Sequence, residues 1–186
     1  AWLKLPANGN GSVLARMDEG KSFRGYDLWV QGRAVGTHII SNWPNNALKV
    51  VSDKPLAENK WQHVAVTYDG SSKASGVKIY IDGQLAGNKV EQDSLKDSIA
   101  TNTPFKIGSR SKGANYNGEL DELRVYDRAL SGDEVKRLGG DPIKSILAMP
   151  KKERTKEQKM ALLNFYLNNN DPEYKLSLIH ISEPTR

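Results

Sequence analysis

Apolar and polar residues alternate along most of residues 1–127. The alternation is clearest at residues 25–32, 47–53, 61–70, 76–83, 104–109 and 118–127. A period of two sends successive side chains to opposite faces of an extended strand, and the Asp-Gly pairs at 69–70 and 82–83 supply the positive φ values that tight hairpin turns need. The pattern predicts an antiparallel sheet protein. Because a single sheet would leave one apolar face in water, we expect two stacked sheets.

A helical pattern replaces the alternation after residue 127. Ser131 and Glu134 have the spacing of a capping box, and two glycines follow the short apolar stripe behind them. Two further helices are expected at residues 141–150 and 155–174, the second capped by Thr155. The side chains of Met160, Leu163 and Leu167 form one face of that last helix. We therefore expect a sandwich over residues 1–140 and an α-helical connector over residues 141–175, leading to a downstream domain.

The charge pattern argues against two classes of partner. The chain of 186 residues has a formal net charge of +5, but its Lys and Arg residues are scattered among Asp and Glu. A basic stripe with interleaved aromatic residues, as a nucleic-acid-binding protein would carry, is missing from the pattern. No apolar run approaches the length of about 18 residues that a membrane-spanning helix needs. The absence of Cys excludes disulfides and thiolate chemistry from these residues.

Several segments taken in order resemble one known family. The segments are "AWLKLP", "KWQHVAVTYDGSS", "VKIYIDGQLAG", "PFKIGSR" and "GELDELRVYDRALSGDEVKRL". Together they are similar to the laminin-G-like jelly roll of the concanavalin A-like superfamily, over residues 1–140. The resemblance implies an all-β, antiparallel two-sheet jelly-roll sandwich. The family's usual opening strand, which precedes "AWLKLP", is not found, so we expect an N-terminally truncated sandwich.

Two longer segments are similar to one subgroup of that family. They are "THIISNWPNNALKV" and "GGDPIKSILAMPKKERTKEQKMALLNFYLNNNDPEYKL". In that subgroup the jelly roll is embedded in very large exported bacterial proteins, beside cytochrome c-type domains and conserved domains of unknown function. The resemblance implies an exported parent protein and neighbouring domains of the same chain as partners. Residues 176–186, "LSLIHISEPTR", instead resemble a translated sequencing adapter, so we expect no biological role for His180.

The remaining histidines and the acidic strand at residues 118–127 do not predict catalysis. His38 and His63 are expected to be ordinary sheet-face residues, because neither has neighbours spaced for a catalytic relay or a metal triad. In laminarinase-type glycosidases of the superfamily, one strand carries Glu-x-Asp-x-Glu, or the same motif with one extra residue before the last Glu. Glu119 and Asp121 match its first two positions, but the third falls on Leu123 or Arg124, and neither can protonate a leaving sugar. We therefore expect no enzyme activity.

Asp121 has two interpretations that the sequence leaves open. The parity of the strand aims its carboxylate at the apolar side, where an unpaired charge would be costly. It would then be a rim carboxylate that accepts backbone N–H groups. The family resemblance implies the alternative, in which an acidic residue at this position helps to bind a calcium ion.

Two loops are candidates for ligand binding, because aromatic residues supply stacking surfaces and amides and guanidinium groups supply hydrogen bonds. Trp2, Trp29 and Trp61 are instead expected in the core or on sheet faces. The candidates are Trp43, Asn45 and Asn46 in the first loop, and Arg110, Asn115, Tyr116 and Asn117 in the second.

Three hypotheses for function follow. We expect a non-catalytic recognition module that binds carbohydrate or glycoprotein within a larger exported bacterial protein. The alternatives are a structural spacer between neighbouring domains and, less in keeping with residues 119–124, a degenerate laminarinase-like glycosidase.

Overall fold

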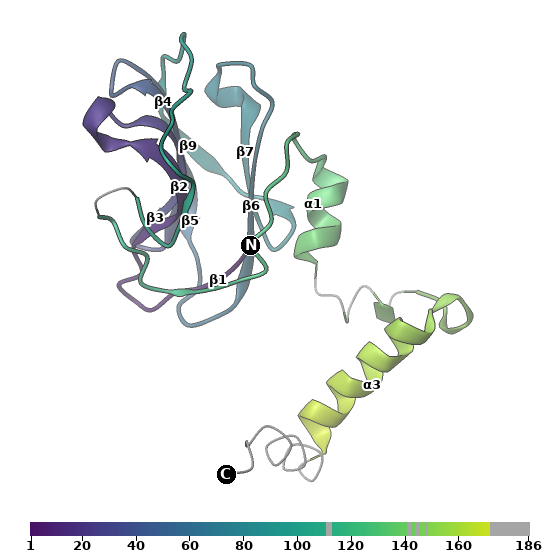
Figure 1. Cartoon of the computed structure of the whole chain (residues 1–186). Coiled ribbons are helices and arrows are strands. Elements are labelled where there is room, and N and C mark those ends of the chain that lie inside the picture. The colour runs from purple at the N-terminus through teal and green to yellow at the C-terminus, as the bar shows by residue number, and fades with distance from the viewer. Residues whose placement is uncertain (111–112, 141–142, 144–145, 148, 172–186) are drawn as a thin grey trace. The chain divides into compact units, whose positions relative to one another are not determined.

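The first part of the chain folds as a sandwich of two antiparallel sheets (Figure 1). The coordinates are a computed structural model, which describes residues 1–110, 113–140, 143, 146–147 and 149–171. The chain divides into two compact units, Ala1–Gly139 and Gly140–Arg186. The expected two-sheet jelly-roll architecture is confirmed.

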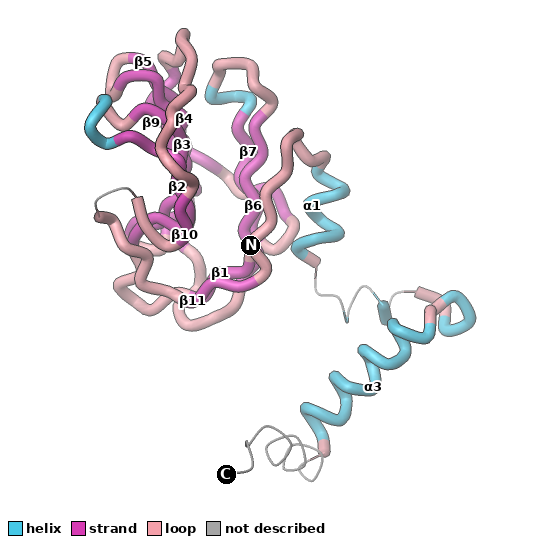
Figure 2. The backbone as a smooth tube through the Cα atoms, viewed as in Figure 1, coloured by secondary structure: helices cyan, strands magenta, loops and turns pink. Residues whose placement is uncertain are grey.

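The larger sheet has six strands in the order β10-β2-β3-β4-β5-β9 (Figure 2). Three of them, β2, β4 and β9, were not singled out by the alternation of the sequence. Their bounds are Lys106–Ile107 for β10, Gly11–Asp18 for β2, Arg24–Gln31 for β3, Ala34–Asn42 for β4, Asn46–Pro55 for β5 and Asn88–Asp93 for β9.

The smaller sheet has five strands in the order β11-β1-β6-β7-β8. Its central strand β6 pairs with β7 from Val64 to Tyr68 but with β1 only at its first residues. The bounds are Glu119–Asp121 for β11, Trp2–Lys4 for β1, Gln62–Tyr68 for β6, Val77–Ile81 for β7 and Gln84–Leu85 for β8.

The main hydrophobic core lies between the two sheets. Alternation along each strand turns one set of side chains into this layer, where burying them from water stabilises the fold. The largest fully buried apolar members include Leu3, Leu5, Val30, Val35, Leu48, Val50, Val64 and Ile79. A second, smaller cluster of Ala15, Met17, Ile40 and Ala47 lies outside this core, with Phe23 and Trp43 packed against it.

The helices begin where their capping residues predict. Helix α1 spans Gly132–Gly139; the Glu134 N–H donates to the Ser131 hydroxyl at 3.3 Å and the Ser131 N–H donates to the Glu134 carboxylate at 2.8 Å. Helix α3 spans Lys156–Asn170 and has the same reciprocal cap between Thr155 and Gln158. Three short 3₁₀ turns lie at Glu19–Lys21, Ala74–Gly76 and Lys151–Glu153. The helix expected at 141–150 and the tail at 176–186 lie largely or wholly outside the described residues.

Two expectations about strands are wrong. The segment 118–127 forms a strand only at Glu119–Asp121, because Glu122 has a φ of 48° and turns the chain out of the ladder. Residues 122–128 therefore carry no strand, and Val125 is 63% exposed. Trp61, expected in the core or on a sheet face, precedes β6 and is 43% exposed.

Candidate functional site

A row of side chains crosses the outer face of the six-stranded sheet. The registers pair Ala15 with Asp27, Asp27 with His38, and His38 with Lys49. Directly opposed residues of neighbouring strands project to the same face, so these four side chains lie side by side. Their chain neighbours Leu28 and Ile39 point the other way, into the core between the sheets.

Asp27 is the hub of this row, and its side chain is fully buried. Its Oδ1 accepts hydrogen bonds from the backbone N–H of His38 at 3.0 Å and from Nδ1 of the His38 ring at 2.9 Å. Its Oδ2 accepts from Nε of Arg110 at 2.9 Å and from Nη2 of Arg110 at 2.6 Å. Four donors compensate the buried carboxylate, which would otherwise be strongly destabilising. The bond to Nδ1 fixes the tautomer of a neutral His38, leaving Nε2 as its acceptor.

Two tryptophans border His38. The Trp29 ring is stacked on the His38 ring with the centroids 5.3 Å apart, and Trp43 meets the same ring edge-on at 5.5 Å. Trp29 lies over Gly36, where an added Cβ atom would come within 2.8 Å of its Nε1. Trp43 is held by its backbone N–H, which donates to the Ser22 carbonyl at 3.0 Å. The glycine thus makes room for a flat aromatic surface on the sheet.

Lys49 completes the site from β5. Its Nζ lies 5.3 Å from the Trp29 ring centroid and 6.0 Å from that of Trp43, both within the range of a cation–π contact. The same ammonium pairs with a Glu91 carboxylate oxygen at 2.7 Å, and this hydrogen bond lowers the pKa of Glu91 below its ordinary value. A cavity of about 270 Å³ opens here, lined by Met17, Phe23, Trp29, Gln31, His38, Ile40, Trp43, Lys49 and Arg110. We call it the outer-face cavity.

Two of the seven loop residues expected to bind ligand line the outer-face cavity, namely Trp43 and Arg110. Asn45 is exposed outside its lining. Asn46 ties two loops together, because its Oδ1 accepts from the Lys96 N–H at 2.8 Å and its Nδ2 donates to Asp97 at 2.6 Å. The first predicted loop therefore contributes its tryptophan to this cavity and one asparagine to the scaffold.

The other three loop residues lie at a different place. Tyr116 and Asn117 border a second hollow of about 340 Å³, together with Lys4, Pro6, Asn59, Gly118 and Glu119. Asn117 accepts from the Asn10 N–H at 2.5 Å, and Asn115 forms an isolated bridge with Ser12. Burial raises the pKa of Tyr116 to about 12, and its hydroxyl donates to the Glu119 carbonyl at 3.2 Å. These contacts make the three residues part of the scaffold that joins the loops.

Asp121 does not point into the apolar layer, so that expectation is wrong. Leu120 is the residue of β11 that packs against the core, which turns Asp121 outward, where it is exposed. Its Oδ1 accepts the Glu122 N–H at 2.7 Å, as the rim-carboxylate interpretation requires. Within the described part of the chain, no three His, Cys, Asp or Glu side chains gather as a metal site would require. Calcium is also bound by backbone and amide oxygens, so a calcium ion at Asp121 stays a prediction.

Glu119, the other acidic residue of the glycosidase-like motif, is also exposed. Its carboxylate pairs with Nζ of Lys4 at 2.8 Å. The position where a general acid would be needed holds Leu123 or Arg124, and Arg124 pairs with Glu122. Among the residues that line the hollow beside Glu119, no other carboxylate is present.

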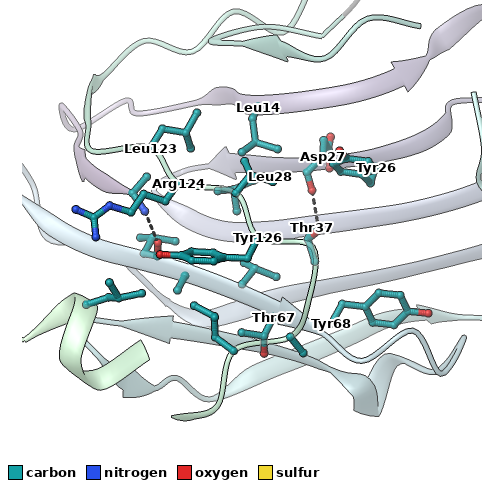
Figure 3. A pocket seen from close by; sticks show the side chains of 18 of the residues that line it. Leu14, Tyr26, Asp27, Leu28, Thr37, Thr67, Tyr68, Leu123, Arg124 and Tyr126 are labelled. Atoms are coloured by element: carbon teal, nitrogen blue, oxygen red, sulfur yellow. Dashed lines mark hydrogen bonds between the residues drawn. The ribbon is translucent and has the colours of Figure 1, made fainter. Parts of the chain in front are cut away.

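A larger cavity of about 410 Å³ lies between the two sheets (Figure 3). Leu14 and Leu28 reach it from the six-stranded sheet and Thr67 from β6, and Tyr126 of the segment after β11 lies in the same space. Its lining is largely apolar, and the Thr37 hydroxyl is occupied by the Asp27 carbonyl at 2.6 Å. This cavity suits packing rather than polar recognition.

The edge of β6 beside this cavity is open. The N-terminal amine of Ala1 donates to the Val64 carbonyl at 3.0 Å, and the Val64 N–H donates to the Ala1 carbonyl at 2.8 Å. By the alternation of an antiparallel ladder, the backbone groups of Val66 and Tyr68 point the same way, and the described residues offer them no backbone partner there.

Burial lowers the pKa of two groups near this edge. The pKa of the Ala1 amine falls to about 6, chiefly through desolvation. Desolvation also lowers the pKa of His63 to about 4, and its Nδ1 is buried without a hydrogen-bond partner in the described structure. Both groups are therefore more easily held in their neutral forms.

Sequence reasoning missed the core of the outer-face cavity. Asp27 and Trp29 project to the same face of β3, and His38 projects to that face from β4. A charged residue with apolar residues on either side of it in β3 was the feature of the sequence that could have indicated this site. Lys49 lay in the strand predicted at residues 47–53, but nothing in the sequence indicated that it belongs to a site.

Comparisons with known proteins agree with this architecture. The N,N-dimethylformamidase beta subunit of Paracoccus aminophilus is 26% identical over 160 residues, which cover 74% of this chain and 21% of that protein. The mouse pentraxin-related protein PTX3 is 22% identical over 149 residues, which cover 75% of this chain and 37% of that protein. The chain thus spans about a fifth to two fifths of the length of these curated relatives.

Among solved structures, the CBM40 of the Ruminococcus gnavus IT-sialidase superposes with a TM-score of 0.60 at 19% identity, covering 75% of this chain and 79% of that one. That CBM40 has also been solved bound to alpha2,3 sialyllactose. At this identity the likeness concerns the fold. No helix among the described residues is long and apolar enough to cross a membrane.

The family itself is shown by a direct match. A laminin-G-type family model, described as the concanavalin A-like lectin/glucanases superfamily, matches residues 1–136. The match covers the two sheets and the start of α1, in the same order as the segments that carried the resemblance. The chain therefore belongs to the concanavalin A-like lectin/glucanases superfamily.

Proposed function

We propose that this chain is a non-catalytic carbohydrate-recognition module and that the outer-face cavity is its binding site. The observation that carries the proposal is the arrangement of Trp29 and Trp43 around the Asp27–His38–Arg110 network. Sugars present apolar ring faces that stack on aromatic side chains, and rims of hydroxyl groups that need fixed donors and acceptors. The cavity combines both on rigid strands, where a buried carboxylate positions the polar groups.

The fold supports this assignment over the alternatives. The CBM40 of the Ruminococcus gnavus sialidase has the same fold and is a carbohydrate-binding module. The acidic residues that would serve a glycosidase are exposed and have other partners. The Glu119 carboxylate pairs with Lys4, and the Asp121 carboxylate accepts the Glu122 N–H. An exported parent protein, with sugar or glycoprotein as the partner, is part of the same proposal.

A binding screen tests the proposal. The full chain would be tested on a glycan and polysaccharide array, and each hit would be measured by calorimetry. Trp43→Ala and Trp29→Ala should each weaken binding about tenfold or more, since aromatic anchors at an interface commonly contribute at least about 1.4 kcal/mol each. Trp61→Ala is the matched control, because Trp61 is exposed and lies outside the cavity.

The spacer hypothesis makes the opposite prediction. A folded protein that binds no sugar on the array would contradict the proposed function and favour a structural role, with the exposed Met160 and Leu163 of α3 as its candidate contacts. Hydrolysis of any array hit, abolished by Glu119→Gln, would instead overturn the non-catalytic assignment.

A further inference from the structure

The polar lining of the outer-face cavity is unbalanced in charge. Gln31, His38, Lys49 and Arg110 are its polar members, and the two that are charged are both cations. The carboxylates that pair with them lie outside the lining: Asp27 is completely buried behind the cavity, and Glu91 is exposed beside it. A ligand in this cavity therefore meets positive groups directly.

Arg110 has donors left over after its ion pair. Its Nε and one N–H of Nη2 are directed at Oδ2 of Asp27. A guanidinium group has five N–H donors, and the described residues provide no hydrogen-bond acceptor for Nη1. The buried carboxylate fixes the plane of the guanidinium group, so its remaining edge is presented in one orientation. Such an edge matches the two oxygens of a carboxylate.

Lys49 supplies a second cation two strands away from Asp27. Its ammonium lies over the faces of Trp29 and Trp43 and is shared with one exposed carboxylate, that of Glu91. An anion that enters the cavity can interact with this ammonium without breaking the buried Asp27 network. Trp29 and Trp43 line the same cavity as the two cations.

We propose, on the basis of the proposed function, that the outer-face cavity selects a sugar that carries a carboxylate group, with Arg110 as the residue that receives it. With a neutral sugar, the free edge of Arg110 and the ammonium of Lys49 can donate hydrogen bonds only to hydroxyl oxygens. A carboxylate adds a full negative charge and two oxygens that can accept from the edge of Arg110 together, which a hydroxyl group cannot offer.

The test compares ligands that differ only at C6 of the sugar, which carries a carboxylate, its methyl ester or a hydroxymethyl group. Galacturonate oligomers, their methyl esters and the corresponding galactose oligomers would be titrated into the full chain at low salt. The acid should bind about tenfold more tightly than its methyl ester, the factor expected for about one extra charge-assisted hydrogen bond. High salt should reduce this preference, because the charges are partly exposed.

Variants separate Arg110 from general effects on the fold. Arg110→Lys keeps a positive charge near Asp27 but removes the planar fork, and Lys49→Gln leaves the Asp27 network intact. Each should reduce the ratio of affinities for the acid and the methyl ester several-fold. Arg124→Gln is the matched control, because Arg124 is exposed and lies outside this cavity.

The outcomes are distinguishable. Equal binding of acid and ester overturns this inference but leaves the proposed function standing. Preference for a sulfated sugar with no binding of galacturonate or of sialyllactose overturns the carboxylate assignment. No binding of any sugar by the folded chain overturns this inference and the proposed function together.

Discussion

Arg110 reaches Asp27 across 83 positions of sequence, and its Nη2 lies 2.6 Å from Oδ2 of a carboxylate whose side chain has no exposed surface. The pair joins the loop after β10 to the middle of β3, so the shape of the outer-face cavity depends on it. Removing one partner of a buried ion pair leaves the other uncompensated, which is usually far more costly than the pair is stabilising.

Asp27→Asn should therefore lower the free energy of unfolding by about 3 kcal/mol, the lower end of the range for breaking a buried pair. Urea unfolding followed by tryptophan fluorescence measures this. Glu119→Gln is the control, because its ion pair with Lys4 is largely exposed and should contribute less than about 1 kcal/mol. Similar losses in both variants would mean that the buried network is not what holds this face together.

Gly36→Ala should disturb Trp29 more than the size of one methyl group suggests. The new Cβ atom would lie 2.8 Å from Nε1 of Trp29, so the indole must leave its place against His38. We expect a loss of about 1–3 kcal/mol in stability, typical of overpacking, together with a change in tryptophan fluorescence and weaker sugar binding.

Gly132→Ala provides the comparison for this substitution. Its Cβ atom would have no neighbour closer than 3.8 Å, and alanine is favoured over glycine in a helix. Fluorescence and binding should be unchanged in Gly132→Ala. An unaltered Trp29 signal in Gly36→Ala would show that the aromatic platform does not rest on that glycine.

Acidification should destabilise the fold through two groups in succession. The pKa of the Ala1 amine falls from 8.0 to about 6 on folding, and that of His63 falls from 6.5 to about 4. In both cases the unfolded chain binds more protons between the two values, so stability must fall as pH is lowered through that window. Protonation of the amine lowers stability between about pH 8 and 6, and protonation of His63 lowers it between about pH 6.5 and 4.

Denaturant titrations from pH 8 to pH 4 check this dependence. Acetylation of the Ala1 amine should flatten the upper window, and His63→Gln should flatten the lower one. A His63→Gln variant with the same slope between pH 6.5 and 5 as the parent would show that His63 does not cause that slope. The Arg128–Glu134 pair lowers the pKa of Glu134 from 4.5 to about 2, so protonation of Glu134 changes the slope of stability against pH only below about pH 4.5.

The strands that the sequence predicts well are those with one polar face. β3, β5, β6 and β7 alternate because one side of each is at least partly open to water. β4 was missed because residues 35–41 are all buried, so its polar and apolar residues do not alternate with a period of two. Its outer face is covered by Trp29 and Trp43, which makes the missing alternation a consequence of the cavity itself.

The candidate site was only half predictable for a related reason. Trp43 and Arg110 were recognised by residue type, since aromatic and guanidinium groups suit a binding loop. Asp27 and His38 meet only through the register of β3 and β4, and Arg110 joins them through a loop that no local pattern places. The error at Asp121 has the same origin, because one residue with positive φ, Glu122, ended the strand on which its parity was counted.

The open edge of β6 makes a prediction that can be read residue by residue. The backbone N–H groups of Ala65 and Thr67 point toward β7 and are bonded there, whereas those of Val66 and Tyr68 point toward the edge that β1 leaves uncovered. Amide hydrogen exchange depends on such local protection. Val66 and Tyr68 should therefore exchange faster than Ala65 and Thr67 on the same strand, with Val64 slow because its N–H is bonded to the Ala1 carbonyl.

Native-state exchange followed by NMR measures all five amides in one experiment. Uniform slow exchange along β6 would mean that some other group covers this edge in solution.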